Sequence, residues 1–177
     1  MMKKIFLFSS FFLLTFPLFT QTWTKTANKD NWGDIIGYDY VQTVTCVGRG
    51  ATGQGTWNLQ IRYEPDKNAI SFVIFPINQD DFSPFRLILP TDVTISLRNG
   101  DNIKTFYGLG QTPDFGGPMI IISTTGKLAD IIFKKASGST DKKLIDELRK
   151  NNNYLILIEG YDNTWFVRAN IKGNMPN

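Results

Sequence analysis

Apolar and polar residues alternate with a period of two along several segments of this chain, and this pattern limits its possible folds more than any other feature. Successive side chains of a strand point to opposite faces, so alternation places the apolar residues on one face, whereas a helix would scatter them. The pattern therefore predicts strands with one buried face. The apolar positions are Trp57, Leu59, Ile61 and Tyr63, then Val93, Ile95 and Leu97, and then Trp165, Val167, Ala169 and Ile171.

Turn-forming residues separate the alternating segments. Pro65 presets φ for a turn in the stretch 64–68. Asn99-Gly100 is typical of a hairpin with a type I′ turn, which needs positive φ at both central residues. A further hairpin is predicted at residues 161–163, and additional strands at 69–75, 85–89, 119–123, 128–134 and 154–158.

One late segment, residues 139–150, has the pattern of a short helix. Ser139 or Thr140 can cap its first N–H groups, and one apolar stripe is formed by Leu144, Ile145 and Leu148. Many antiparallel strands, spaced by about ten residues and accompanied by one late helix, favour a β-sandwich. We therefore expect a mainly β protein, an antiparallel β-sandwich, with the helix packed against a sheet or covering one end.

The first residues have the build of a secretory signal peptide. Lys3 and Lys4 precede an uncharged apolar run over residues 5–19, which small polar residues follow. The run is shorter than the roughly 20 residues that a membrane-spanning helix needs. We expect a signal peptide at residues 1–22 and a single β-sandwich domain at 23–177, without a transmembrane span, exported to the periplasm, the cell surface or the medium.

Charge and cysteine content limit the kinds of binding partner and of covalent link that the chain can have. Removing Lys3 and Lys4 reduces the basic residues from 19 to 17, against 16 acidic residues, so the exported chain would be nearly neutral. This balance argues against binding to nucleic acid or to an anionic membrane. Cys46 is the single cysteine, which excludes an internal disulfide and a lipid anchor behind the signal. We expect a buried, inert thiol, with an intermolecular disulfide as the alternative.

The chain contains no histidine, and this excludes the serine and cysteine nucleophiles that depend on histidine, together with zinc sites built on histidine. A carboxylate pair or a Ser/Lys system would remain for an enzyme, but no motif identifies either. Asp80 and Asp81 lie in a turn-rich stretch where solvated acids are the default, and they lack the regular ligand ladder of a calcium loop. We expect no catalytic residue, no metal site and no cofactor.

Aromatic residues in loops are the candidate contacts with a ligand or a partner. An exposed ring can stack on a sugar or fill a pocket on another protein. The alternative is that these rings fold back over the ends of the sandwich. The loop at residues 108–118, rich in glycine and proline, is the most suggestive position. The candidate contacts are Trp32, Phe82, Tyr107, Asp114 and Phe115.

Gly48, Gly50 and Gly53 have the spacing of a dinucleotide-binding turn, G-x-G-x-x-G. Such a turn needs a helix that opens at the third glycine and holds the pyrophosphate at its N-terminus. Here the chain continues from Gly53 into the alternating segment at 57–63, so no helix is available. We interpret these glycines, with Gly55, as a connection between two antiparallel strands.

The segment WTKTANKDNWGDIIGYDY, residues 23–40, resembles the start of a group of exported bacterial β-proteins without an assigned activity. Their mature chains begin with Trp and continue through D-x-[FW]-G-D-x-x-G-x-x-Y into strands. The chain departs from this pattern at Ile35-Ile36, where the group has proline and threonine. The resemblance implies an exported β-sandwich and brings no function with it. The matching residues are Asp30, Trp32, Gly33, Asp34, Gly37 and Tyr40.

Three functions are compatible with these observations. The first is a non-enzymatic module of the bacterial envelope that binds a protein partner. The second is a carbohydrate-binding module that uses its loop aromatics. A hydrolase that depends on two carboxylates ranks last, because sequence spacing does not show two carboxylates roughly 5 to 10 Å apart across a cleft.

Overall fold

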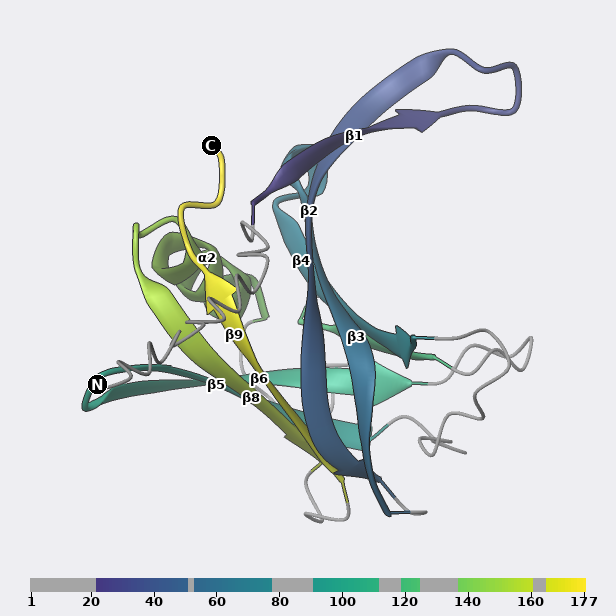
Figure 1. Ribbon diagram of the computed structural model, residues 1–177. Coiled ribbons are helices and arrows are strands. Elements are labelled where there is room, and N and C mark those ends of the chain that lie inside the picture. Colours follow the sequence, from purple (N-terminus) through teal and green to yellow (C-terminus); the bar gives the residue numbers. More distant parts are fainter. Residues whose placement is uncertain (1–21, 51–52, 78–90, 112–118, 125–136, 161–164) are drawn as a thin grey trace, which may run out of the picture.

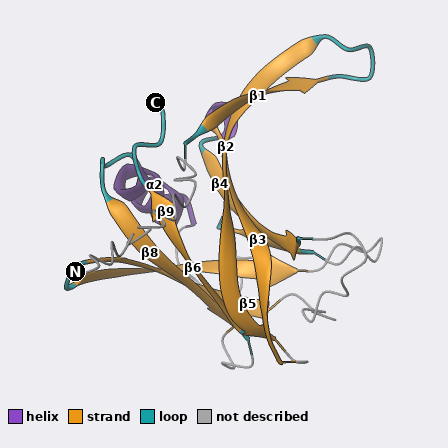
Figure 2. Ribbon diagram, in the orientation of Figure 1, coloured by secondary structure: helices purple, strands orange, loops and turns teal. Residues whose placement is uncertain are grey.

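A computed structural model describes residues 22–50, 53–77, 91–111, 119–124, 137–160 and 165–177. Within these ranges the chain forms nine strands, one short 3-10 helix and one α-helix (Figures 1 and 2). The elements are β1 (Thr24–Lys29), β2 (Ile35–Gly50), β3 (Gly53–Glu64), η1 (Pro65–Lys67), β4 (Ala69–Pro76), β5 (Thr91–Asn99), β6 (Asn102–Gln111), β7 (Ile120–Ser123), α2 (Ser137–Leu148), β8 (Asn153–Gly160) and β9 (Phe166–Lys172).

The strands β2 to β9 form a closed antiparallel barrel of eight strands. Their order is β2-β3-β4-β7-β6-β5-β8-β9, and pairing of β9 with β2 closes the circle. The predicted β-sandwich is therefore wrong, because the strands belong to one sheet that closes on itself. Alternation places one face of every strand inside in both architectures, so the sequence pattern did not distinguish a barrel from a sandwich.

Gly48 allows the barrel to close at the seam between β2 and β9. It pairs with Val167, and a Cβ atom at this position would lie 2.1 Å from the carbonyl oxygen of Phe166. Farther along the seam, the buried side chain of Gln42 takes over the role of a backbone partner. Its Nε2 donates to the carbonyl oxygen of Lys172 at 2.9 Å, and its Oε1 accepts from the N–H of the same residue at 3.1 Å.

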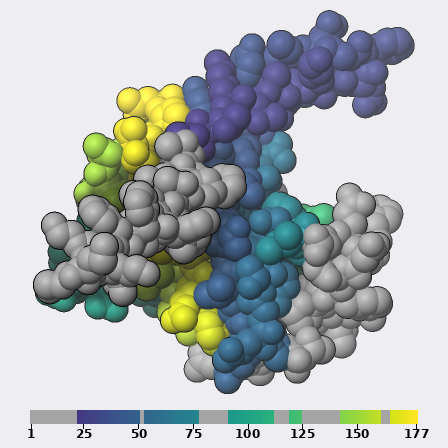
Figure 3. Space-filling model, viewed as in Figure 1, coloured from purple at the N-terminus to yellow at the C-terminus, as the bar shows by residue number. Residues whose placement is uncertain are grey.

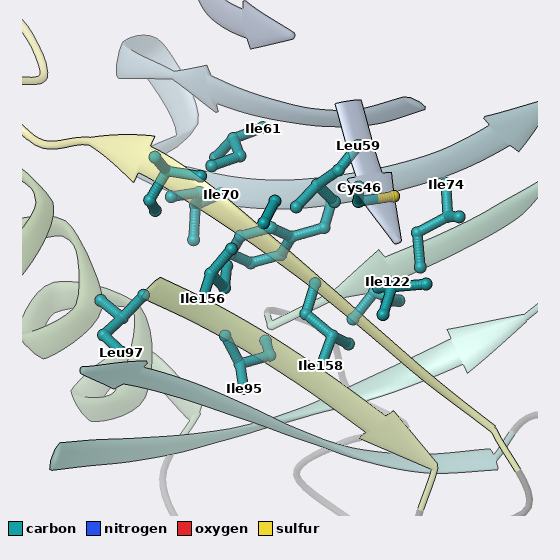
Figure 4. Close-up of a cluster of buried hydrophobic side chains, with 14 of the residues drawn as sticks. Cys46, Leu59, Ile61, Ile70, Ile74, Ile95, Leu97, Ile122, Ile156 and Ile158 are labelled. Atoms are coloured by element: carbon teal, nitrogen blue, oxygen red, sulfur yellow. The ribbon is translucent and has the colours of Figure 1, made fainter. Parts of the chain in front are cut away.

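The interior of the barrel is filled with side chains, mainly branched aliphatic ones. The alternating residues of the three predicted segments all point inward and are buried, as the sequence pattern predicted. Cys46 lies among them, only 1% exposed, so the predicted buried thiol is confirmed. Figure 4 shows ten of the packed residues: Cys46, Leu59, Ile61, Ile70, Ile74, Ile95, Leu97, Ile122, Ile156 and Ile158.

The single described α-helix, α2, packs at the barrel end where β8 begins and β9 ends (Figure 1). Its predicted apolar stripe is confirmed, because Leu144, Ile145 and Leu148 are all buried. The helix begins at Ser137, so Ser139 and Thr140 lie inside it and are not its N-cap. Toward the opposite end of the barrel, the ring of Trp57 lies against Gly55.

The connections between strands agree in part with the predictions. Residues 65–67 form η1, and Asn68 ends it in the left-handed conformation, with φ of 47°. The β5–β6 hairpin is confirmed, but positive φ occurs at Gly100 and not at Asp101, so the turn is not of type I′. The β8–β9 pairing is also confirmed. The strands predicted at 85–89 and 128–134, and the turn at 161–163, lie outside the described residues.

The glycines that mimic a dinucleotide-binding turn belong to two paired strands. Gly48 pairs with Gly55, and Gly50 pairs with Gly53, in the ladder between β2 and β3. The expected antiparallel connection is confirmed, although the glycines continue the strands almost to the hairpin tip. No helix follows Gly53, which is the first residue of β3.

Candidate functional site

A hairpin arm, residues 24–40, projects beyond the closed barrel (Figures 1 and 3). It consists of β1 and the first part of β2, which pair from Thr24–Val41 to Lys29–Ile35. β1 pairs with β2 and lies outside the barrel circle. The arm lies within residues 23–40, the segment that carries the D-x-W-G-D-x-x-G-x-x-Y motif.

The tip of the arm is a turn organised by Asp30. Its Oδ1 accepts hydrogen bonds from the backbone N–H groups of Trp32 and Asp34, both at 2.9 Å. The backbone N–H of Asp30 donates to the carbonyl oxygen of Asp34 at 2.9 Å, and Gly33, with φ of 92°, donates to that of Asp30 at 3.1 Å. An aspartate that binds backbone N–H groups two or more residues ahead fixes a turn. The tip is therefore held in one conformation by its own side chain.

The base of the arm is fixed to the barrel by a buried carboxylate. Asp39, only 2% exposed, forms an ion pair with Arg62 of β3. Nδ2 of Asn28 donates to Oδ1 of Asp39 at 2.7 Å, which ties β1 to the same group. The indole N–H of Trp23 contacts the carbonyl oxygens of Lys172 and Gly173 at 3.3 and 3.2 Å. The arm is thus attached by polar contacts at β3 and at the end of β9.

Apolar side chains are exposed along the arm and at its tip. The even-numbered residues of β2 from Gln42 to Gly50 point into the barrel, and the same stripe continues past Tyr40 to Tyr38, where the barrel no longer covers it. Ile36 follows at a register irregularity between β1 and β2. Ile36 is 67% exposed, and Lys25 lies over the Tyr38 ring at 3.9 Å. Trp32 is 90% exposed. We call Trp32, Ile35, Ile36 and Tyr38 the arm patch.

A second surface feature lies at the other end of β2. A depression of about 340 Å³ opens over the outer face of β3, β2 and β9, and Gly48 and Gly55 contribute bare backbone to its lining. Strand register places the surrounding outward residues in two rows. One row is Gln54, Arg49 and Phe166, and the other is Thr56, Val47 and Arg168.

The candidate contacts predicted from sequence do not form one site in the part of the chain that the structure describes. Trp32 lies at the tip of the arm, whereas Tyr107 lies on the barrel wall, on β6 opposite Thr94. Phe82, Asp114 and Phe115 lie outside the described residues. Ile36, Tyr38, Phe166 and Arg168 were not predicted. Continuation of the even-numbered stripe before Tyr40 was the available signal for the first two.

Three acidic residues of the described part of the chain have structural partners. Asp30 organises the arm turn, and Asp146 faces Arg149 at 4.0 Å on the surface. Glu147 belongs to α2 and is buried, and Nζ of Lys104 and Nζ of Lys150 donate to its Oε2 at 2.6 and 2.7 Å. Asp80, Asp81 and Asp114 lie outside the described residues.

Among the groups with shifted pKa values, Cys46 and Glu147 are the two that bear on possible chemistry. Burial raises the pKa of the Cys46 thiol to about 12, so this thiol is protonated at neutral pH. Burial alone would also raise the pKa of Glu147, but hydrogen bonds from Lys104, Lys150 and Tyr154 outweigh it and lower that pKa below its usual 4.5. Within the described residues, no group of three histidine, cysteine or acidic side chains is placed to hold a metal ion.

None of the helices in the described part of the chain has the length and apolar character needed to cross a membrane. Comparison with known protein families, curated proteins and solved structures found no match to this chain.

Proposed function

We propose that the protein is an exported, non-enzymatic binding module of the bacterial envelope, and that it contacts a protein partner through the arm patch. The observation that carries this proposal is the tip of the arm, where an almost fully exposed tryptophan is held by a turn that Asp30 organises. Single large apolar residues are common on protein surfaces. A group of such residues on a projecting element is typical of an interaction site.

The chemistry of the arm patch favours a protein partner. Tryptophan and tyrosine contribute much of the binding energy at protein interfaces, where they fill pockets of the partner. The turn fixes the backbone of Trp32 before binding, so less backbone conformational entropy is lost on association. Outside the Asp39–Arg62 ion pair, the charges on the arm are balanced, with Lys25 and Lys29 against Asp30 and Asp34. Such a surface has no strong attraction for anionic lipid or nucleic acid.

Export and the lack of catalysis are supported by the sequence. The basic start, the short apolar run and the small residues behind it have the order of a signal peptide. The absence of histidine removes the commonest general base, and the single thiol is held protonated by its burial. These features favour a protein that acts by contact in the envelope or outside the cell.

The proposal is tested by affinity capture from the envelope fraction with the wild-type protein, a Trp32→Ala variant and an Ile103→Ala control. Ile103 is 62% exposed but lies on β6, away from the arm. We expect Trp32→Ala to reduce capture of a dominant protein partner by about tenfold or more, as for a central interface tryptophan. Ile103→Ala should capture it normally.

Both variants should keep the wild-type melting temperature, because truncating an exposed residue changes the free energy of unfolding by only about 0.5 kcal/mol or less. Equal capture by the wild-type protein and the Trp32→Ala variant would contradict the proposed role of the arm patch. A glycan, rather than a protein, that binds through Trp32 would favour the carbohydrate-binding alternative, since an exposed indole ring also stacks on sugars.

A further inference from the structure

The depression over β3, β2 and β9 has the composition of a small-molecule site. Its volume of about 340 Å³ falls at the lower end of the range of about 300 to 1,000 Å³ that is typical of ligand pockets. It combines apolar surface from Phe166 and Val47 with hydrogen-bonding groups from Gln54 and Thr56. It lies at the far end of β2 from the arm, so it is separate from the surface proposed above (Figure 1).

Two glycines lie at the depression, where β9 closes on β2. Gly48 and Gly55 are direct partners in the β2–β3 ladder, and both line the depression. Neither tolerates a side chain without displacement, because a Cβ at Gly48 would meet the Phe166 carbonyl oxygen at 2.1 Å, and one at Gly55 would meet the Trp57 ring at 2.7 Å. Side chains at these two positions would point into the barrel, so the depression itself is bounded by the outward side chains around them, and the glycines mark how closely β9 approaches β2 here.

The charge of the site comes from arginine. Arg168 lines the depression from β9, is exposed, and forms no ion pair with any acidic residue in the described part of the chain. Arg49 adds a second guanidinium at the border, 5.9 Å from the centre of the Phe166 ring. The one acidic residue opposite this row is Glu159 of β8, the register partner of Phe166. Arginine presents parallel N–H donors that match a carboxylate.

We propose that this depression binds a ring-shaped ligand that carries a carboxylate, namely a uronic acid unit of a glycan. Arg168 receives the carboxylate, the apolar face of the sugar ring packs on Phe166 and Val47, and Gln54 and Thr56 bind the hydroxyl groups. A neutral sugar lacks the group that Arg168 recognises, and an aromatic carboxylate lacks the hydroxyl groups that the polar wall of the site would bind.

The test uses isotope-labelled protein isolated from cells that express the full chain, titrated with galacturonate and its short oligomers while amide signals are recorded by NMR. Galactose and benzoate are the comparison ligands. We expect uronates to shift the signals of residues 47–49, 54–56 and 166–168 at concentrations up to about 10 mM, a range that covers weak single-sugar affinities. Galactose and benzoate should bind at least about tenfold more weakly.

The variant Arg168→Gln should weaken uronate binding by about tenfold or more, as expected when a charge-assisted hydrogen bond is lost. The matched control is Arg98→Gln, which removes an arginine at the β5–β6 turn. The proposal would be overturned if Arg168→Gln bound uronate as well as the wild type, or if galactose or benzoate bound as tightly as uronate. It would also be overturned if the shifted signals lay outside these three segments, or if no uronate shifted any signal.

Discussion

At the scale of single residues, one buried carboxylate connects α2 to the barrel. Glu147 accepts hydrogen bonds from Lys104 of β6 and from Lys150 just after the helix. The hydroxyl of Tyr154 lies 3.1 Å from its Oε1 and 2.9 Å from its carbonyl oxygen. Removing one partner from a buried polar cluster leaves the remaining polar atoms without hydrogen bonds. The free-energy cost of these unpaired atoms is larger than the net stability that the lost interaction contributed.

We therefore predict that Glu147→Gln lowers the free energy of unfolding at pH 7 by about 1 to 3 kcal/mol. Because folding lowers the pKa of Glu147 below 4.5, its ionised form stabilises the folded state above that pH. This contribution is lost as the pH falls through the folded-state pKa. The difference between wild type and variant should thus shrink below about pH 4.5 in urea titrations.

The neighbouring Asp146 provides the control, since its side chain is 55% exposed and lies 4.0 Å from Arg149. Asp146→Asn should change the free energy of unfolding by about 0.5 kcal/mol or less at both pH values. If the free energy of unfolding changed with pH in the same way for wild type and Glu147→Gln, the Glu147 cluster would not be the source of the predicted loss of stability in acid.

At the scale of elements, the arm combines a fixed tip with an uncovered apolar stripe. The Asp30 carboxylate accepts two backbone hydrogen bonds there, so its removal should affect the tip more than the barrel. We predict that Asp30→Ala changes global stability by about 1 kcal/mol or less. It should speed hydrogen exchange at the amides of Trp32 and Asp34 by about tenfold and weaken partner binding.

The matched control for that variant is Asp34→Ala. This variant removes a carboxylate charge from the same turn. Among the described residues the Asp34 carboxylate accepts no hydrogen bond, and the hydrogen bonds of the Asp34 backbone would remain in the variant. Amide exchange at Trp32 that is equally fast in both variants would show that charge, rather than the Asp30 hydrogen bonds, governs the tip.

The elements themselves were largely predictable from sequence, because alternation reports directly which face of a strand is buried. The inward residues Leu59, Ile95 and Val167 were all identified in this way. Pairing between distant strands was not predictable, since it depends on a missing side chain at Gly48 and on the amide of Gln42. Trp32 was singled out by its turn context. The depression was missed because Phe166 and Arg168 reach the β2–β3 hairpin only through the β2–β9 seam.

At the scale of the whole molecule, closure of the barrel depends on the approach of β9 to β2. We predict that Gly48→Ala lowers the free energy of unfolding by about 3 kcal/mol or more, because the new Cβ meets backbone rather than a flexible side chain. The measurement is urea unfolding together with hydrogen exchange at the amides of β9, which should lose protection.

Gly108→Ala is the comparison for the closure prediction, since its Cβ would lie 3.1 Å from a methyl group of Ile122 and 3.2 Å from the carbonyl oxygen of Ser123. A shift of a few tenths of an ångström relieves both contacts, whereas the 2.1 Å contact at Gly48 needs a much larger one, so this variant should be clearly less destabilised. If both variants lost a similar amount of free energy of unfolding, the β2–β9 seam would be packed no more tightly than the rest of the sheet.

Site-specific photocrosslinking in living cells shows whether the arm patch is where the protein meets its partner. A photoreactive residue is placed at position 32 or 36 of the arm, or at position 103 of the barrel as the control. We expect one dominant crosslinked protein from positions 32 and 36, and none from position 103. Crosslinks from position 103 to that protein, with none from the arm, would contradict this role of the arm patch.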